Sequence, residues 1–495
     1  MNPDVRDLHK ALLSEHQDAR SKLGGDSAYA KTAPVLGESA NIEASTLKQP
    51  GGFRRHHLNR EADERGVPYA QRPTSWQQSL VKSVRPLIRV GYFNRVLGVG
   101  TRVDERGECG QMQTAAAILK SFVGSGVLFM PGAVAQAGWA VSSVTIVIVA
   151  LLNAVCVRLL LDSIEHTGIN SFGDLAFRAA GRLGRESVHA MLIICQFASV
   201  ICYFTFIAQT MESAGFLAAL GLTPTSVVLL ELAIMAPLGL LRSVEQLEYP
   251  ILLADAFILF GLGTVLWLLV DELEAHGPSP SASAASLGGL GPFLGTALFT
   301  FEGLPLVLPI RNEMAQPELF WPLFCKCFVA IVALFVAFGV CGYLAYGAST
   351  APVLLSSIST GGELMLVVRV LYIIALTLSS PLVFIPAARI TELWAFGANP
   401  KGRFWAANAL RVAEYVGFAA VALWANSDDE SFQLFLGIAG VVSGAPIAFI
   451  FPAYIYLRTM PTSAGPFGRA VAVGCICFGV AAFVLVAFQT VGALL

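Results

Sequence analysis

Two apolar stretches of the sequence carry residues that could bind a small polar molecule at the middle of a membrane. Gly124, Ser125 and Gly126 interrupt the run QMQTAAAILKSFVGSGVLFMPGAVAQAGW. Glu302 and Gly303 interrupt the run LGPFLGTALFTFEGLPLVLPIRN. Such breaks are tolerated in a membrane helix only where protein or a water-filled cavity supplies partners for the free backbone groups. The two breaks therefore indicate a binding site.

The broken backbone would offer groups of both signs to a ligand. The free amides and the positive helix end that follow Gly126 could bind a carboxylate, and glycine lets the backbone approach that ligand closely. The carbonyls of the second break, from Phe299 to Phe301, could accept hydrogen bonds from an ammonium group. Together the two breaks favour a zwitterion.

Side chains that face the breaks would set the selectivity. Phe301 is a candidate gate. The candidate polar walls are Gln196, Ser199 and Tyr203 of the third predicted span and Ser379 and Ser380 of the eighth. For the first break the main alternative is close helix packing, because small residues commonly serve that purpose in membrane helices.

Glu302 is the candidate for proton coupling. A carboxyl group at the bilayer centre costs a few kcal/mol or more, so it is by default functional or paired. We interpret Glu302 as a proton carrier or as a polar anchor for the unwound segment, and a structural hydrogen bond to helix-end amides is the alternative. Other ionisable residues in predicted spans compete for the proton role: Lys120, Glu231, Asp255, Arg369, Arg411 and Glu414.

The basic members of that set have a structural interpretation. Long basic side chains near helix ends can snorkel to the interface, so Lys120, Arg369 and Arg411 are expected to be anchors or ion-pair members. Arg411 and Glu414, three residues apart on one predicted helix, could pair with each other. His189 is expected at the inner interface.

The elements that must position these residues are membrane helices. Of 495 residues, 55% are hydrophobic and 13% are charged, whereas about a quarter of the residues in soluble domains are charged. A bilayer core of about 30 Å needs roughly 20 apolar residues per helix. Eleven such runs are predicted, near 112–139, 141–163, 187–211, 224–241, 247–270, 290–310, 321–346, 363–386, 403–424, 431–457 and 468–492.

The distribution of charge predicts how the chain is oriented in the membrane. Lys and Arg gather in cytoplasmic loops; with a cytosolic N-terminus, the predicted inner loops hold ten of them and the outer loops none. Leu495 then lies on the extracellular or lumenal side. Residues 1–75 are interpreted as a disordered cytosolic tail. Residues 76–110 are interpreted as a basic amphipathic juxtamembrane segment that lies on the inner leaflet or packs against the inner loops.

Several classes of function are disfavoured. The net charge of −2, without a basic stripe, argues against a nucleic acid partner. The chain has no H-E-x-x-H, G-x-x-x-x-G-K-[ST] or G-x-S-x-G motif, so the sequence predicts neither an enzyme nor an ATP-driven pump, and no cofactor or metal. The energy for transport would come from a substrate gradient or a coupled ion, and an acidic residue at the site favours a proton over an unaided uniporter. Sodium is the alternative coupling ion, because backbone carbonyls also bind it.

The interruptions fall in the first and sixth predicted spans, as expected for two five-helix repeats of opposite topology. The predicted fold is therefore an all-α integral membrane protein of eleven transmembrane helices. It consists of a five-plus-five inverted repeat with broken helices 1 and 6 and an extra C-terminal helix.

At these residues the sequence resembles the amino acid/auxin permease family, in particular its vacuolar and proton-coupled amino acid transporters. The stretches ILKSFVGSGVLFMPGAVAQAGW and FLGTALFTFEGLPLVLPIRNEMAQP resemble the first and sixth spans of that family. PLGLLRSVEQLEYPILLADAFILFG resembles its passage from span four to span five, and SSPLVFIPAARITE and SGAPIAFIFPAYIYLR resemble its eighth and tenth spans. The resemblance covers roughly residues 110–490.

The resemblance implies a secondary transporter of small neutral amino acids that is coupled to protons. It also implies that Gly124, Ser125, Gly126, Phe301, Glu302 and Gly303 line the substrate site. The long N-terminal region is similar to that of the fungal vacuolar members, which implies export from the vacuole with Leu495 in the lumen; a plasma-membrane location is the alternative. A transporter-like sensor, which binds amino acids and signals through its N-terminal region, is the alternative function.

Overall fold

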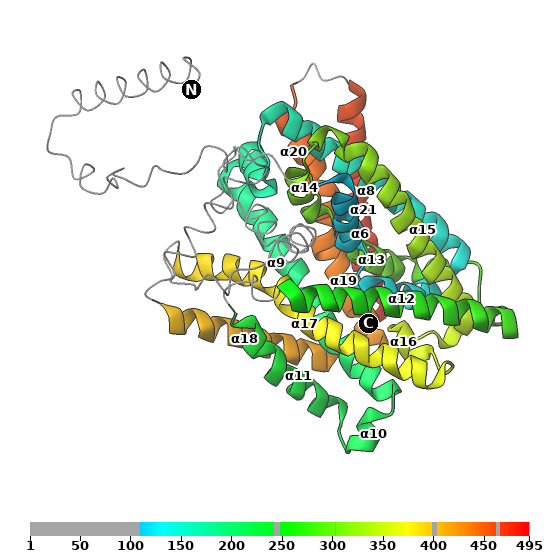
Figure 1. Ribbon diagram of the computed structural model, residues 1–495. Helices are drawn as coiled ribbons and strands as arrows, with labels where there is room; N and C mark the ends of the chain where they lie inside the picture. The colour runs from blue at the N-terminus through cyan, green and yellow to red at the C-terminus, as the bar shows by residue number, and fades with distance from the viewer. Residues whose placement is uncertain (1–108, 242–247, 302, 398–402, 462–465, 495) are drawn as a thin grey trace, which may run out of the picture. The chain divides into compact units, whose positions relative to one another are not determined.

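The computed structural model describes residues 109–241, 248–301, 303–397, 403–461 and 466–494 (Figure 1). The predicted tail 1–75 and all but the last two residues of the predicted juxtamembrane segment 76–110 lie outside these residues. The described chain is helical, apart from turns and one isolated bridge between Cys109 and Met314.

The helices follow one another along the chain with short connections. Their bounds are α6 Gln111–Phe122, η3 Ser125–Phe129, α7 Met130–Ala137, α8 Trp139–Thr167, α9 Phe172–Ser213, α10 Phe216–Leu220, α11 Pro224–Gly239, α12 Glu248–His276, η5 Leu287–Gly289, α13 Leu290–Thr300, α14 Leu304–Glu313, η6 Pro317–Leu319, α15 Phe320–Tyr346, η7 Gly347–Ser349, α16 Leu354–Ser357, α17 Gly362–Phe396, α18 Phe404–Ala425, α19 Asp429–Ala439, η9 Gly440–Gly444, η10 Pro446–Ile450, α20 Phe451–Thr459 and α21 Pro466–Leu494.

Within the described residues, ten helical stretches are long and apolar enough to cross a membrane. Ten of the eleven predicted spans coincide with them. At the position of the fourth predicted span, α11 has only 16 residues. At 1.5 Å per residue it is about 24 Å long, shorter than a bilayer core of about 30 Å.

The third predicted span is longer than expected, because α9 begins at Phe172, well before the predicted start near residue 187. Two helical parts of α9 meet at a kink where Ala180 and Gly181 leave helical geometry. Gly181 has a φ of 64°, a left-handed conformation that glycine adopts without steric penalty. The chain therefore changes direction between the two helical parts.

The beginning of α19 shows how a polar residue fixes a helix end. The exposed side chain of Asp428 accepts a hydrogen bond from the backbone N–H of Ser431 at 2.7 Å. Hydrogen bonds to the charged form stabilise it, so the N–H of Ser431 lowers the pKa of Asp428 below its ordinary value.

Two groups of helices matter for function. The first contains the interrupted spans: α6, η3 and α7 pack against α15, η3 and α7 also pack against α13, and α6 packs against α14. The second group contains α9, α11, α17 and α18. In it α11 contacts the three other helices, and α17 and α18 both contact α9 (Figure 1). The long helix α12 joins the groups, since it packs on both α15 and α17.

Candidate functional site

The first span is interrupted at the predicted position. Helix α6 ends at Phe122, Val123 and Gly124 are extended, and the chain restarts as the 3-10 helix η3 before α7. The first backbone hydrogen bond of the restarted segment runs from the N–H of Val127 to the carbonyl of Gly124, at 3.4 Å. The amides of residues 124–126 are therefore the helix-start amides, which have no partner within a helix.

The sixth span is interrupted as well. Helix α13 ends at Thr300 and α14 begins at Leu304. The N–H of Phe301 makes the last bond back into α13, to Ala297 at 3.1 Å. The carbonyls that follow Ala297 thus lie at a helix end, where carbonyls have no partner within the helix. Glu302 lies outside the described residues.

The two breaks face each other at van der Waals distance. A Cβ added to Gly126 would lie 3.2 Å from Cγ2 of Thr300. A Cβ added to Gly303 would lie 2.7 Å from the carbonyl oxygen of Ser121 and 2.8 Å from the ring of Phe122. Real Cβ atoms essentially never come closer than 3.0 Å to such atoms, so Gly303 fits where a larger residue would force the segments apart.

The other predicted site residues are buried or half-buried. Phe301 is fully buried, and its ring lies 6.0 Å from that of Phe328 and 5.1 Å from that of Phe335, both on α15. On α9, Ser199 donates to the carbonyl of Cys195 one turn earlier, at 3.1 Å, and Tyr203 is half-buried.

On α17, Ser379 is buried. The hydroxyl of its neighbour Ser380 lies 3.2 Å from that of Tyr415 on α18, so Ser380 is directed toward α18. Whether Ser199, Tyr203 and Ser379 contact a substrate stays a prediction.

Near the breaks the structure reveals a feature that the sequence interpretation missed. The tenth predicted span contains two π-helical turns, η9 and η10, and such turns often mark functional positions. Gly440 of η9 packs so closely on α13 that an added Cβ would lie 1.8 Å from the carbonyl oxygen of Gly295. Gly440, Gly444 and Pro446 in the sequence are the signals that could have indicated this irregularity.

An ion pair lies just before the first break. Lys120, two residues before the end of α6, donates to Asp255 of α12. Both side chains are about three-quarters buried. The prediction that Lys120 is an ion-pair member is confirmed, and the pair ties the first half of the broken span to α12.

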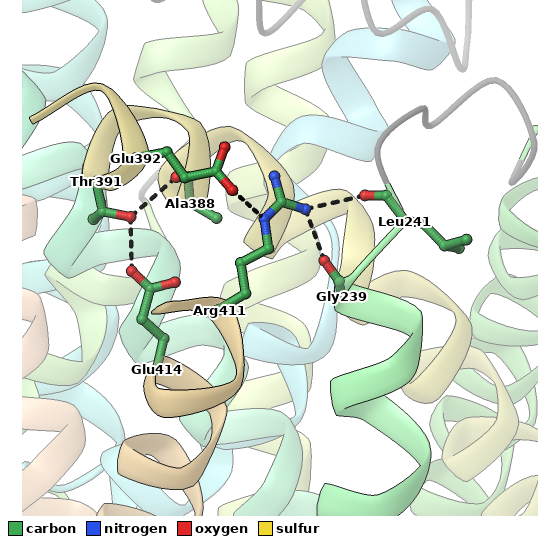
Figure 2. Close-up of polar contacts among 7 residues, drawn as sticks. All are labelled: Gly239, Leu241, Ala388, Thr391, Glu392, Arg411 and Glu414. Carbon is green, nitrogen blue, oxygen red and sulfur yellow. Dashed lines mark hydrogen bonds and ion pairs between the residues drawn. The ribbon is translucent and has the colours of Figure 1, made fainter. Parts of the chain in front are cut away.

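A second polar centre lies where α11, α17 and α18 meet. Figure 2 shows Arg411 of α18 between Glu392 of α17 and the end of α11. Its Nε donates to Glu392 at 2.7 Å, and its NH1 group donates to the carbonyls of Gly239 and Leu241 at 2.8 and 3.1 Å. Arg411 is 1% exposed. Helix α11 can thus end early, because a buried guanidinium satisfies its last carbonyls.

One expectation about the ionisable residues needs correction. Glu414 does not pair with Arg411: it contacts the hydroxyl of Thr391 at 2.7 Å, because Arg411 is engaged by Glu392 and α11. His189 is buried within the protein, and its position near the inner interface stays a prediction. Arg369 is also buried and donates to carbonyls before α17.

These features define a class of protein: a polytopic helical membrane protein with two spans interrupted at facing positions. Half-helix ends of this kind contact the substrate and coupling ions in many secondary transporters. The chain belongs to the family described as transmembrane amino acid transporter protein, which matches residues 108–491. The predicted family, that of the amino acid/auxin permeases, is confirmed.

Proteins of two yeasts and of a plant are similar to this chain. The chain is 29% identical over 388 residues to "Vacuolar amino acid transporter 3" of Saccharomyces cerevisiae, covering 76% of this chain and 55% of the relative. It is 28% identical to the protein of the same name in Schizosaccharomyces pombe, covering 82% of this chain and 62% of the relative. It is also 27% identical to "Amino acid transporter ANT1" of Arabidopsis thaliana, covering 77% and 92%. The chain thus spans less than two thirds of the two yeast proteins.

Among solved structures, the chain is similar to a manganese transporter of Eremococcus coleocola, crystallised with an aromatic bis-isothiourea substituted compound. The TM-score is 0.40 and the identity 11%, over 86% of this chain and 97% of that one. A likeness at this level supports no conclusion about the site.

Proposed function

We propose that the protein is a secondary active transporter of small neutral amino acids that works by alternating access. The observation that carries the proposal is the contact between two helix breaks, with Gly126 against Thr300 and Gly303 against Ser121. Membership of the amino acid transporter family and the names of the yeast and plant relatives support it.

In this proposal the breaks bind the two charged ends of the substrate. The amides of Gly124, Ser125 and Gly126 hold the carboxylate, since they open a helix whose dipole is positive there. The carbonyls at the end of α13 accept hydrogen bonds from the ammonium group. The expected lining side chains are Phe301, Gly303, Ser199, Tyr203 and Ser379, together with Glu302.

We also propose the finer features of this transporter. Eleven transmembrane helices, with α11 as a short fourth, form a five-plus-five inverted repeat with an extra C-terminal helix. A proton is the coupling ion, for which Glu302 is a candidate carrier. The protein exports amino acids from the vacuole, with the N-terminus in the cytosol and Leu495 in the lumen. Family membership, the charge bias of the loops and the yeast relatives support these features.

The direct test is flux of a radiolabelled amino-acid panel into proteoliposomes, with and without a pH gradient. Gly126→Trp should abolish both binding and uptake, because its side chain would fill the contact between the breaks. Gly417→Trp is the matched control: Gly417 is exposed on α18 with no described atom near its Cβ position, so uptake should persist.

Two results would overturn the proposal. If Gly126→Trp inserts and still transports, the breaks are not the site. If the wild-type protein binds amino acids without turnover, a sensor that signals through its N-terminal region is the better description.

A further inference from the structure

Glu414 is a half-buried carboxyl group near the middle of a long helix. It is the eleventh of the 22 residues of α18, so about 15 Å of helix separates it from either end. Its Oε2 atom is buried and has no hydrogen-bond partner among the described residues. An ionised carboxylate with a buried, unpartnered oxygen is strongly disfavoured, because it loses its hydration without compensation.

The hydrogen bonds of Thr391 indicate where a proton lies. Its Oγ1 is 2.7 Å from Oε1 of Glu414 and 3.0 Å from the carbonyl oxygen of Ala388 (Figure 2). A hydroxyl has one hydrogen to donate and a carbonyl oxygen has none. If Thr391 gives its hydrogen wholly to Ala388, the hydrogen in the other contact comes from Glu414. Both contacts are full two-centre hydrogen bonds only when Glu414 is a protonated acid; with an ionised Glu414 the one hydroxyl hydrogen is shared between two acceptors.

The charges around Glu414 agree with this assignment. Within the described residues, the charged groups that face it are Arg411 on its own helix and Glu392 on α17. These two form an ion pair at 2.7 Å and neutralise each other. At the end of α11, the carbonyls of Gly239 and Leu241 accept hydrogen bonds from Arg411 and carry no charge. Among the other titratable groups on these helices, Glu186 of α9 accepts from Trp394, His189 lies beside Glu186, and Tyr415 contacts Ser380. Glu231 of α11 is buried, and neither of its carboxyl oxygens has a hydrogen-bond partner among the described residues.

We propose that Glu414 is a proton-binding site of this transporter, an inference that rests on the proposed function. When its proton leaves to water, a carboxylate remains one helical turn from Arg411. The carboxylate draws the guanidinium away from the carbonyls of Gly239 and Leu241. The end of α11 is then released, because those carbonyls lose the group that satisfies them.

This release has a route of contacts to the first break. Helix α11 packs on α17, and α17 packs on α12, which carries Asp255. Asp255 pairs with Lys120 on α6, just before the break. A proton at Glu414 and a substrate at the break would thus both affect the positions of α11, α12 and α6. Thermodynamic coupling between two sites requires such shared elements.

The protonation state can be measured directly by infrared spectroscopy of the purified protein in lipid. A protonated carboxylic acid has a carbonyl stretch that a carboxylate lacks. The difference between wild type and Glu414→Gln should contain this band at neutral pH and lose it on alkalinisation. Glu363→Gln, which alters an exposed carboxyl on α17, should remove no such band. If Glu414→Gln also removes none, Glu414 is ionised and the inference is overturned.

The transport role is tested in proteoliposomes. Glu414→Gln should lose accumulation driven by a pH gradient and keep exchange of substrate between the two sides, because glutamine resembles the protonated acid. Glu302→Gln is measured beside it: if that variant loses the pH drive while Glu414→Gln keeps it, Glu302 carries the proton and the inference fails.

Failure of the proposed function and failure of the variant to insert can both be distinguished from failure of this inference. If the wild type transports no amino acid, the proposed function fails, while the infrared difference still decides whether Glu414 binds a proton. If Glu414→Gln does not insert, Thr391→Val replaces it. Loss of the hydroxyl partner should shift the carbonyl band of Glu414, and an unchanged band overturns the inference.

Discussion

The glycine breaks and the Arg411 cluster are two solutions to one physical problem. In both places a helix ends inside the apolar part of the protein, which leaves backbone groups without partners. At the break between α6 and η3, no described side chain accepts a capping hydrogen bond from the amides of residues 124–126. At the end of α11, the guanidinium of Arg411 donates hydrogen bonds to the carbonyls of Gly239 and Leu241.

The difference suggests how to separate a binding site from a structural joint in this fold. A helix end that the protein satisfies with its own buried cation contributes to stability, and a helix end left to glycines can accept a ligand. Substitutions of Arg411 or Glu392 should therefore act first on unfolding, whereas substitutions in the breaks should act first on binding and flux.

The largest expected effect is on stability, from Arg411→Leu. It removes the guanidinium that Glu392 and two buried carbonyls contact, and breaking a buried pair in this way costs about 3–5 kcal/mol. Thermal unfolding in lipid nanodiscs measures the loss. The control is Arg158→Leu, which removes a half-exposed pair with Asp162 on α8 and should cost about 1 kcal/mol or less. Equal losses for the two variants would contradict a structural role specific to Arg411.

The next largest effects are expected from substitutions of two glycines in the breaks. Gly303→Ala places a methyl group 2.7 Å from the carbonyl oxygen of Ser121, so it should destabilise the protein by about 1–3 kcal/mol through overpacking and abolish flux. Gly124→Ala meets no described atom within 4 Å, and its φ of −139° suits any residue. It should unfold like the wild type.

The effect of Gly124→Ala should instead appear in substrate binding. If the backbone at Gly124 approaches the carboxylate of the ligand, a methyl group there should weaken binding roughly tenfold, which corresponds to about 1.4 kcal/mol. Equilibrium binding of a radiolabelled substrate measures it. Unchanged affinity would place the ligand away from the first break.

The sequence predicted the interruptions because their signals are local. Glycine and proline weaken a helix through their own backbone geometry, whatever lies around them, so the ends of α6 and α13 were found within a few residues. The ten long spans followed from apolar composition, which is also a local property. The end of α11 at Gly239 was also predicted within two residues, but the contact that satisfies its carbonyls was not, since Arg411 lies 172 positions from Gly239.

The pairing of charges also required the structure. Spacing alone favoured Arg411 with Glu414, because they lie three residues apart on one helix. The fold brings Glu392 of α17 to Arg411 instead, and Thr391 to Glu414. Likewise, Lys120 could be recognised as an ion-pair member, but its partner Asp255 lies 135 positions away. Contacts between helices that are distant in sequence leave no periodic signal in one chain.

The smallest expected effect concerns the tie between Lys120 and Asp255. Because both side chains remain partly exposed, a double-mutant cycle with Lys120→Met and Asp255→Asn should give a coupling energy of about 1 kcal/mol or less. Its consequence for transport should be clearer than its consequence for unfolding. If α6 must separate from α12 when the site opens, both single variants should speed substrate exchange, and the double variant should add little to either. Exchange rates that fall in both variants would show that the pair positions the break for binding rather than restraining its opening.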